Sequence, residues 1–364
     1  MSDLAEYPSR QSSPPPRRRG RLPALLLFVL LVGALVAGVV VGGRAVLARL
    51  SGSGTPDYVG AGQGEVLVQV KTGQAAAAIA TTLLGKGVVK SEVAFTKAAT
   101  ADPRSLSVQP GFYRLHSQMS GAAAVALLLD PAARALSRVT LPEGSTLAVT
   151  LKKISEATEV PLADLQTAVA DPAAIGLPAY AKGQLEGFLF PATYDVEPGT
   201  SAAATLRMMT ARFTKAAAEA DLDAKAAALG RSPYDVLVTA SLIEKETAFA
   251  PDRSKVARVI YNRLAGNMPL QLDSTVNYLR TDKKARLTLE DLKQVSPYNT
   301  YLVPGLPPTP IDSPGQDAIA AALDPAAGDY RYFVTVSKDG SSLFTADYNE
   351  FLKAKAKAQA EGVY

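Results

Sequence analysis

The stretch "RSPYDVLVTASLIEKETAF", residues 231–249, predicts the most clearly specified helix of the chain. Ser232 suits the N-cap position, Pro233 suits the first helical position, and Asp235 completes a capping box. The helix is therefore expected to begin at residue 233 and to run into the "EKET" sequence. The start of the helix is well defined. Near its end lie two glutamates, Glu244 and Glu246, and either could be a catalytic acid or only a surface charge.

Helical phase separates these two glutamates. Glu244 lies seven residues after Leu237 and three after Ser241, so it continues a stripe of apolar and small side chains. A carboxyl group on a half-buried stripe loses water, which favours its protonated form and suits a general acid. Glu246 is turned about 200° from Glu244 and is expected to be a charge at the helix end. The spacing favours Glu244, and the alternative that both are surface charges stays open.

Composition narrows the possible chemistry to carboxyl groups. Among the 364 residues, of which 48% are hydrophobic, there is no cysteine, which excludes disulfides, thiolate nucleophiles and cysteine-ligated metals. The single histidine, His116, cannot form a multi-histidine zinc site and is expected to have a structural or surface role. Acid–base chemistry is therefore assigned to carboxylates, and no metal and no cofactor is expected.

The charge distribution argues against a nucleic-acid partner. The formal net charge is +4, and all of it lies in residues 1–44, so the rest of the chain carries equal numbers of basic and acidic side chains. A domain that binds nucleic acid is expected to show a basic surface in its folded part. We therefore expect no nucleic-acid binding.

Residues 22–43, "LPALLLFVLLVGALVAGVVVGG", predict a transmembrane helix. These 22 uncharged residues are enough to cross about 30 Å of hydrocarbon. A buried core helix and a cleaved signal peptide are the alternatives, but the apolar part of a signal peptide is normally about 7 to 15 residues long. Arginines are concentrated upstream, so the sequence predicts a single-pass protein of the cell membrane with a cytoplasmic amino terminus and an extracytoplasmic remainder.

Two stretches of the remaining chain look alike. Residues 68–89 and 139–160 each predict a short strand, a turn at Gly73 or Gly144, and a helix. This weak repeat is compatible with a small β-α-α module of the kind that binds glycan chains, or with a plain scaffold module.

The rest of the chain predicts mixed helices and antiparallel strands, which is an α+β fold. Two loops, over residues 185–201 and 296–312, are expected to border a cleft, because long loops without secondary structure are usually functional. Aromatic packing beneath the first loop is the alternative. The other expected elements are an Ala-rich helical tract over 201–229 ending at Gly230, a helix over 252–264 stopped by Gly266, a short helix capped by Asp273, a helix after 312 with Ser313 in a capping box, a hairpin around Asp339 and Gly340, and a final helix.

In this order, the landmarks resemble the YceG-like (MltG) family of endolytic murein transglycosylases. The motifs that carry the resemblance, over about residues 61–355, are "LEGFLFPATY", "TASLIEKET", "VARVIYNRL", "MPLQLDSTVNY", "YNTYLVPGLPPTPI", "SPGQDAIAAAL" and "YRYFVTVSKDGSSLFT". The resemblance implies a membrane-anchored enzyme whose outer part cuts the glycan strands of peptidoglycan internally. It divides the chain into a disordered cytoplasmic head (1–21), a transmembrane helix (22–43), a linker (44–65), a LysM-like subdomain (66–135) and a catalytic domain (136–364).

The resemblance also implies a set of site residues. The family's catalytic glutamate is the first of the "EKET" motif, which falls on Glu244. The residues expected to orient the sugars or the acid are Gln271, Asp273, Tyr298 and Asn299. Two loop positions, Ser274 and Thr309, depart from the family pattern and leave these polar groups in place.

One glutamate suffices for the reaction that the resemblance implies. It would protonate the oxygen of the MurNAc-β-1,4-GlcNAc bond and then take a proton from the C6 hydroxyl of the same MurNAc, which attacks the anomeric carbon and gives a 1,6-anhydroMurNAc end. A hydrolase would need a second carboxylate at about 5 to 9.5 Å, for which Asp273 is the candidate. A third possibility is a non-catalytic peptidoglycan-binding tether for synthases. The expected partners are glycan strands, the membrane and peptidoglycan synthases, with termination of nascent strands as the expected role.

Overall fold

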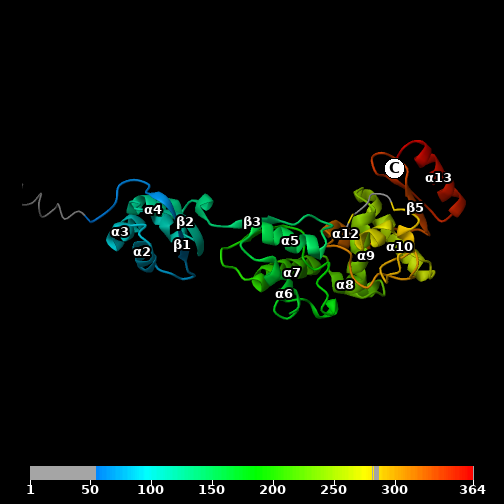
Figure 1. The fold of residues 1–364 in the computed structure, drawn as a ribbon, viewed down its shortest axis with the longest axis horizontal. Helices are drawn as coiled ribbons and strands as arrows, with labels where there is room; N and C mark the ends of the chain where they lie inside the picture. The colour runs from blue at the N-terminus through cyan, green and yellow to red at the C-terminus, as the bar shows by residue number, and fades with distance from the viewer. Residues whose placement is uncertain (1–54, 281, 283–286, 364) are drawn as a thin grey trace, which may run out of the picture. The chain divides into compact units, whose positions relative to one another are not determined.

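The computed structural model describes residues 55–280, 282 and 287–363 (Figure 1). They form two compact units: unit 1, whose described part comprises residues 55–110 and 114–133, and unit 2, which comprises Gly111–Tyr113 and the described residues from Arg134 onward. The predicted head, the transmembrane helix over 22–43 and half of the predicted linker lie outside the described residues. Among the residues that are described, no helix is long and apolar enough to cross a membrane.

Unit 1 is built around one pair of strands and three α-helices. Strand β1 (Gln63–Val70) is hydrogen-bonded to β2 (Gly111–Ser117), whose first three residues cluster with unit 2. The helices are α2 (Ala76–Gly85), α3 (Glu92–Ala101) and α4 (Gly121–Leu128), with the short 3-10 segments η1 (Pro103–Ser107) and η2 (Pro131–Ala133). Ser91 and Ser120 cap α3 and α4 through their hydroxyl groups. His116 contacts the carbonyl of Gly64 in this unit, which gives it a structural partner.

The two predicted strand–turn–helix stretches are confirmed as local structure. In the first, β1 and α2 flank Gly73, whose φ of +73° requires glycine in practice. In the second, β3 (Ser137–Thr140) and α5 (Leu147–Ala157) flank Gly144 with a φ of +71°. The LysM-like character of residues 66–135 stays a prediction.

The first part of unit 2 pairs β3 with β4 (Thr193–Val196) in antiparallel register, with Ser137 opposite Val196. Arg138 and Asp195 form an ion pair across the two strands, and the Thr140 and Thr193 hydroxyls lie 3.0 Å apart. The short helix α6 (Leu162–Val169) and the segment η3 (Ala179–Ala181) follow α5 in this region.

The predicted single helical tract over 201–229 is wrong in one respect. The structure breaks it into α7 (Ala202–Glu219) and α8 (Leu222–Ala228). The break lies at Asp221, which adopts a left-handed conformation with φ of +56° and so cannot continue either helix. An Ala-rich tract offers no glycine or proline to signal this break.

Helix α9 (Pro233–Glu246) lies at the centre of unit 2 and carries the "EKET" motif at its end. Ser232 caps it by accepting a hydrogen bond from the N–H of Asp235, as predicted. The helix is not amphipathic as expected, because Tyr234 and every residue from 236 to 243 is buried. It packs against α8, α10 (Arg253–Ala265), α11 (Asp273–Tyr278) and α12 (Gln316–Leu323), with η4 (Ala250–Asp252) between α9 and α10. A helix that is buried on all sides shows no contrast between a buried face and a solvated face. Helical phase therefore cannot indicate which of its side chains is functional.

The carboxyl-terminal part confirms the predicted hairpin and final helix. Strands β5 (Tyr332–Thr335) and β6 (Ser342–Thr345) pair antiparallel, with Tyr332 opposite Thr345, and α13 (Tyr348–Ala360) packs on them. The segment η5 (Asp291–Lys293) precedes the long loop. The capping box predicted at Ser313 is wrong, because α12 begins one residue after Gly315, which occupies the N-cap. The mixture of helices and two-stranded antiparallel sheets confirms the α+β class.

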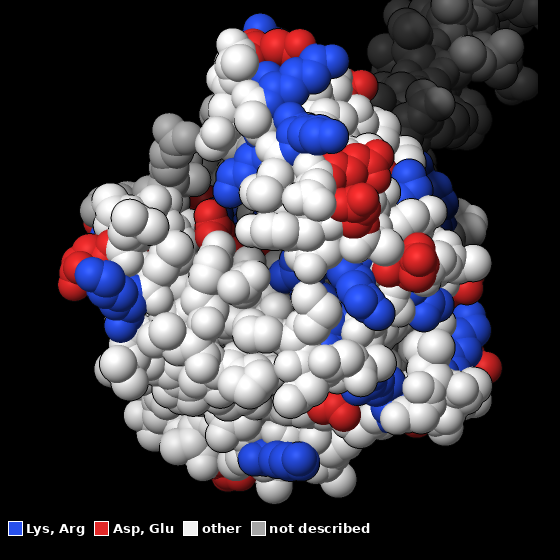
Figure 2. Space-filling model, turned by 90° about the vertical axis from the view of Figure 1, so that its right-hand side faces the viewer, with Lys and Arg blue, Asp and Glu red and all other residues white. Residues whose placement is uncertain are grey.

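The surface at the end of unit 2 that carries α10, β5 and α13 shows no concentration of one charge. Figure 2 shows Lys and Arg side chains lying among Asp and Glu side chains, with broad uncharged areas between them. This distribution fits the balanced charge of the chain beyond residue 44.

Candidate active site

A cavity of about 590 Å³ lies in unit 2 beside the end of α9. Four segments that are distant in sequence surround it: the turn before α5, the end of α9, helix α11, and the loop that leads to α12. The lining residues are Gly144, Ser145, Thr146, Val149, Lys245, Glu246, Asp273, Ser274, Asn277, Tyr278 and Ile311. The cavity wall combines apolar surface with polar side chains, and two carboxylates, Glu246 and Asp273, line it.

Glu246, the last residue of α9, is half-buried at this cavity. Burial raises the pKa of Glu246 to about 7, and the negative charge of Asp273 acts in the same direction, whereas the polar groups of Ser274 and the Arg263 guanidinium oppose both. A carboxyl group with this pKa is partly protonated at neutral pH. It can therefore both donate and accept a proton at the same working pH.

Asp273 lies at the start of α11 and is held by a tyrosine that the sequence did not single out. The hydroxyl of Tyr301 donates a hydrogen bond of 2.5 Å to Oδ1 of Asp273. Burial and this hydrogen bond raise the pKa of Tyr301 above its ordinary value, so the phenol keeps its proton for the carboxylate. Asp273 thus faces the cavity as a fixed negative charge beside Glu246.

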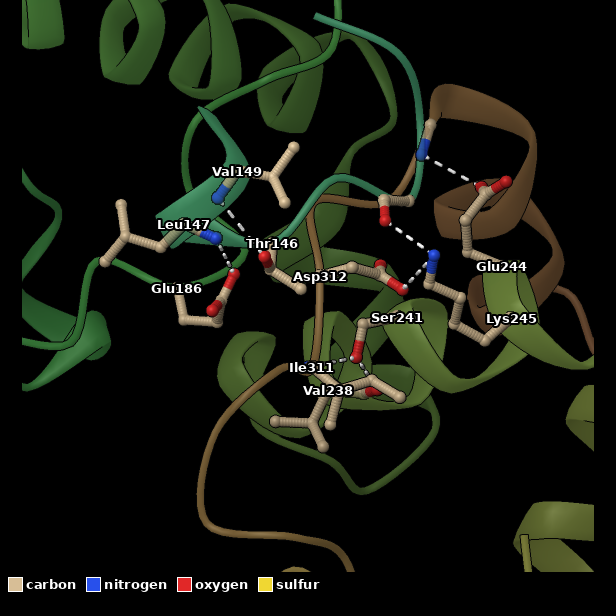
Figure 3. A network of polar contacts seen from close by, with 12 residues as sticks. Thr146, Leu147, Val149, Glu186, Val238, Ser241, Glu244, Lys245, Ile311 and Asp312 are labelled. Atoms are coloured by element: carbon tan, nitrogen blue, oxygen red, sulfur yellow. Dashed lines mark hydrogen bonds and ion pairs between the residues drawn. The ribbon is translucent and has the colours of Figure 1, made fainter. Parts of the chain in front are cut away.

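Glu244 lies on a different side of α9 and does not line the cavity. Its side chain is 8% exposed, its Oε1 lies 3.4 Å from the guanidinium of Arg253, and its Oε2 accepts a hydrogen bond of 3.1 Å from the N–H of Gly315. Figure 3 shows it turned toward the start of α12. Glu244 therefore connects the end of α9 to Arg253 and to the start of α12, and its catalytic role stays a prediction.

Lys245, between the two glutamates, reaches the turn before α5. Its ammonium donates to the carbonyl of Gly144 at 2.6 Å and lies 4.0 Å from Oδ2 of Asp312 (Figure 3). Asp312 is fully buried, and burial raises its pKa well above the usual range, with Lys245 opposing this shift.

A second buried carboxylate, Glu186, lies in the same network. Its Oε1 accepts from the N–H of Leu147 at the start of α5, and its Oε2 accepts from the hydroxyl of Tyr278. Because Tyr278 lines the cavity, Glu186 connects α5 and α11 behind the cavity wall.

The other predicted site residues have varied surroundings. Gln271 is exposed with a positive φ of 49° and does not line the cavity. The ring of Tyr298 lies 5.0 Å from that of Tyr278, and its hydroxyl lies 2.9 Å from that of Thr309, so it supports the wall.

Asn299 is fully buried in the loop that precedes α12. Its amide donates to the carbonyls of Leu292 and Gln294, and its side-chain oxygen accepts from the N–H of Tyr301. With its amide engaged on both sides, Asn299 is better suited to holding this loop than to touching a sugar.

Sequence reasoning missed Glu246, Tyr301 and Tyr278 as residues of the site. A usable signal for Glu246 was the run from Val236 to Ile243, which holds no charged residue and therefore indicates a helix buried all round. No comparable signal marks Tyr301, whose contact with Asp273 joins positions 28 residues apart. Among the described residues, no group of three or more His, Asp or Glu side chains is arranged to hold a metal ion.

The YceG-like family model matches residues 68–357. A protein of Bacillus subtilis named endolytic murein transglycosylase is 34% identical over 307 residues, which cover 80% of this chain and 84% of the relative. A protein of the same name from Streptococcus pneumoniae is 30% identical over 309 residues, covering 77% of this chain and 56% of the relative, so the alignment spans little more than half of the streptococcal protein.

A solved structure supports the same assignment. The 2.6 Å crystal structure of a YceG-like protein from Listeria monocytogenes superposes with a TM-score of 0.54 at 30% sequence identity, covering 80% of this chain and 99% of that one. Since the family match spans most of the chain and includes all the residues around the cavity, this chain belongs to the YceG-like family.

Proposed function

We propose that this protein is a lytic transglycosylase that cuts peptidoglycan glycan strands internally, with Glu246 as the acid and then the base. The two named relatives support the reaction class, since both are named endolytic murein transglycosylase. The observation that carries the choice of residue is the half-buried Glu246 carboxyl at the cavity, whose pKa burial raises to about 7.

In this mechanism, protonated Glu246 donates its proton to the oxygen of the MurNAc-β-1,4-GlcNAc bond as that bond breaks. The resulting carboxylate removes the proton of the MurNAc C6 hydroxyl, whose oxygen attacks the anomeric carbon. A C1–O6 bond forms, the GlcNAc end leaves with a hydroxyl, and Glu246 regains its proton. The products are a 1,6-anhydroMurNAc end and a free GlcNAc end, with no water consumed.

The neighbours of Glu246 favour this use of a single carboxyl group. The negative charge of Asp273 disfavours ionisation of Glu246, which increases the fraction of the acid that is protonated when substrate arrives. The hydrogen bond from Tyr301 fixes the Asp273 carboxylate. In this proposal Asp273 orients the sugar and tunes the acid, Gln271 and Tyr298 contribute to the rim and the supporting wall, and Asn299 shapes the loop.

Two variants distinguish the two glutamates. Purified peptidoglycan is incubated with Glu246→Gln or Glu244→Gln protein, and the released muropeptides are analysed by mass spectrometry. Anhydro-muropeptides from the Glu244 variant and none from the Glu246 variant are expected. The reverse pattern would return the catalytic role to Glu244, as the sequence motif predicted.

Hydrolysis is the second candidate, because Glu246 and Asp273 line the same cavity. Two carboxyl groups on either side of the bond are the usual requirement of a glycoside hydrolase. The two reactions differ in the mass of the products, since hydrolysis adds one water to each new reducing end. A product set composed of reducing ends would replace the transglycosylase proposal with a muramidase-like hydrolase.

We further propose that residues 22–43 anchor the enzyme in the cell membrane, with its amino terminus in the cytoplasm and unit 2 outside. The uncharged length of this stretch and the arginines before it support this topology. An enzyme held there would meet nascent strands and terminate them, beside peptidoglycan synthases. Longer glycan strands in a deletion strain are expected. Release of the protein from membranes by a high-salt wash would contradict the anchor.

A further inference from the structure

Lys245 connects three segments of unit 2 at one wall of the cavity. Its ammonium extends from the end of α9, donates to the Gly144 carbonyl at 2.6 Å, and lies 4.0 Å from Asp312. These contacts are drawn in Figure 3. The fit is close, because a Cβ built on Gly144 would lie 2.9 Å from the Lys245 nitrogen. The φ of +71° at Gly144 favours glycine at this turn.

Asp312, beneath this ammonium, is unusual among the buried acids of the unit. Its side chain is 0% exposed, and neither of its carboxylate oxygens has a hydrogen-bond partner. A buried carboxyl group without hydrogen bonds destabilises the folded state unless a cation is near. By contrast, the buried Asp252 accepts hydrogen bonds from the N–H of Ser342 and from Lys255. The Lys245 ammonium, 4.0 Å from Oδ2, is thus the cation that opposes the rise in the pKa of Asp312 caused by burial.

The backbone around this pair forms the cavity wall. The N–H of Gly144 donates to the carbonyl of Ser313, and the N–H of Ser313 donates to the carbonyl of Ser145, both at 2.9 Å. Gly144, Ser145 and Thr146 line the cavity together with Glu246. The turn at Gly144 and Ser145 is therefore held on two sides. The Lys245 ammonium joins it to α9, and the backbone hydrogen bonds with Ser313 join it to the loop before α12.

We propose that Lys245 and Asp312 form a positioning pair that holds Gly144–Thr146 in place as one wall of the cavity beside Glu246. This inference rests on the proposed function, in which the cavity receives the glycan strand. The pair contacts no reacting atom and acts through the turn that Lys245 holds. Its loss should therefore weaken binding of the strand, so that KM rises by more than kcat falls.

The test uses the full-length protein and soluble, uncrosslinked glycan strands. For Lys245→Met, KM should rise by about tenfold or more, and any loss of kcat should be smaller than this rise, which is the pattern of lost ground-state binding. Lys245→Arg keeps the cation and a donor for the Gly144 carbonyl, so it should recover most of the loss in KM.

Lys255 offers a matched control. Its side chain is 40% exposed and pairs with the buried Asp252 at 3.3 Å, much as the 41% exposed Lys245 pairs with Asp312, but it does not line the cavity. Lys255→Met should lower the melting temperature without raising KM. If Lys255→Met raised KM as much as Lys245→Met, the rise would come from losing a lysine that pairs with a buried aspartate and not from the cavity wall. That result would overturn the proposal.

The double variant Lys245→Met/Asp312→Asn keeps the test informative if the single variant folds poorly. Removing the buried charge with its cation should restore the melting temperature, while KM stays high because the turn has lost its anchor. A double variant that is stable and has the KM of the unmodified protein would overturn the positioning role.

The outcome for Glu246 separates this proposal from the proposed function. If Glu246→Gln cleaves strands as fast as the unmodified protein, the cavity is not the reaction site and the proposed function fails, whatever Lys245 does. If Glu246→Gln is inactive and a folded Lys245→Met has an unchanged KM, the positioning pair alone is refuted.

Discussion

The backbone N–H of Gly315 donates a hydrogen bond of 3.1 Å to Oε2 of Glu244. This contact joins the end of α9 to the start of α12, and Arg253 holds the other oxygen of the same carboxylate. The carboxylate of Glu143 also lies against Gly315, where an added Cβ would be 1.9 Å from its Oε1. Glu244 is therefore part of a packed junction between helices, whereas Glu246 faces the cavity.

The first prediction concerns the rates of the two glutamine variants. Glu246→Gln should lower kcat for glycan cleavage by at least about a hundredfold, because the amide can neither donate nor take the proton. Glu244→Gln keeps a side-chain oxygen that can accept the hydrogen bond from the N–H of Gly315, but it removes the buried negative charge that pairs with Arg253. It should lower the free energy of unfolding by about 1 to 3 kcal/mol with kcat within a few-fold.

Steady-state cleavage and thermal unfolding of the two variants check this prediction. The unmodified protein, prepared in parallel, is the reference for both measurements. A folded Glu244→Gln protein with as large a loss of kcat as Glu246→Gln would contradict the assignment.

The second prediction concerns the pH dependence of cleavage. Burial raises the pKa of Glu246 to about 7, and the first step needs the protonated form. The rate should therefore be lost as the pH rises through about 7, since kcat/KM follows the protonated fraction of the free enzyme. Rates measured from pH 5 to 9 on soluble strands provide the profile. A rate that stays constant up to pH 9 would exclude Glu246 as the acid.

The sequence predicted the local elements around the site better than it predicted their relation to one another. Ser232 predicted the start of α9, and Asp339 with Gly340 predicted the hairpin, because caps and tight turns depend on residues that are close in sequence. Glu244 was favoured over Glu246 by helical phase and by the family motif, and the argument from helical phase assumes that one face of a helix meets water. Helix α9 has no such face, because four other helices enclose it.

The polar contacts of the site depend on pairs of residues that are far apart in sequence. The Tyr301–Asp273 hydrogen bond joins a loop to α11, and the contact of Lys245 with Gly144 spans 101 positions. Periodicity and capping rules describe single elements and cannot bring these partners together. The acidic and polar character of the site was predictable from the lack of cysteine and the single histidine, but the choice among the carboxylates required the fold.

The third prediction concerns Gly187, which lies next to Glu186 in the "LEGFLFP" motif. Its φ is +88°, and a Cβ there would lie 2.5 Å from Cβ of Pro310, a ring that cannot turn aside. Gly187→Ala should lower the free energy of unfolding by about 2 to 4 kcal/mol, from backbone strain and overpacking together. Chemical denaturation of the full-length protein measures this change.

Gly199 is a matched control for Gly187. Its φ is +74°, and nothing lies within 4 Å of a Cβ built on it. Gly199→Ala should therefore show the backbone strain alone, about 1 kcal/mol. Equal losses for the two alanine variants would mean that the contact with Pro310 contributes nothing.

The last prediction links the pKa of Glu246 to the stability of the fold. The pKa is raised from its ordinary value of 4.5 to about 7, so the folded state binds more protons than the unfolded state between these two values. The contribution of Glu246 to stability is then fully present below pH 4.5 and is lost as the pH rises through about 7. Glu246→Gln has no such titration, because the amide does not ionise.

The glutamine variant should therefore gain stability relative to the unmodified protein as the pH rises from 5 to 8. Replacing Glu246 should thus raise stability while it lowers activity, because the fold holds the ionised carboxylate in an unfavourable environment. Melting temperatures of both proteins across this range give the difference directly. A difference between Glu246→Gln and the unmodified protein that does not change with pH would show that Glu246 titrates as an ordinary surface carboxylate, and the argument for it as the acid would lose its physical basis.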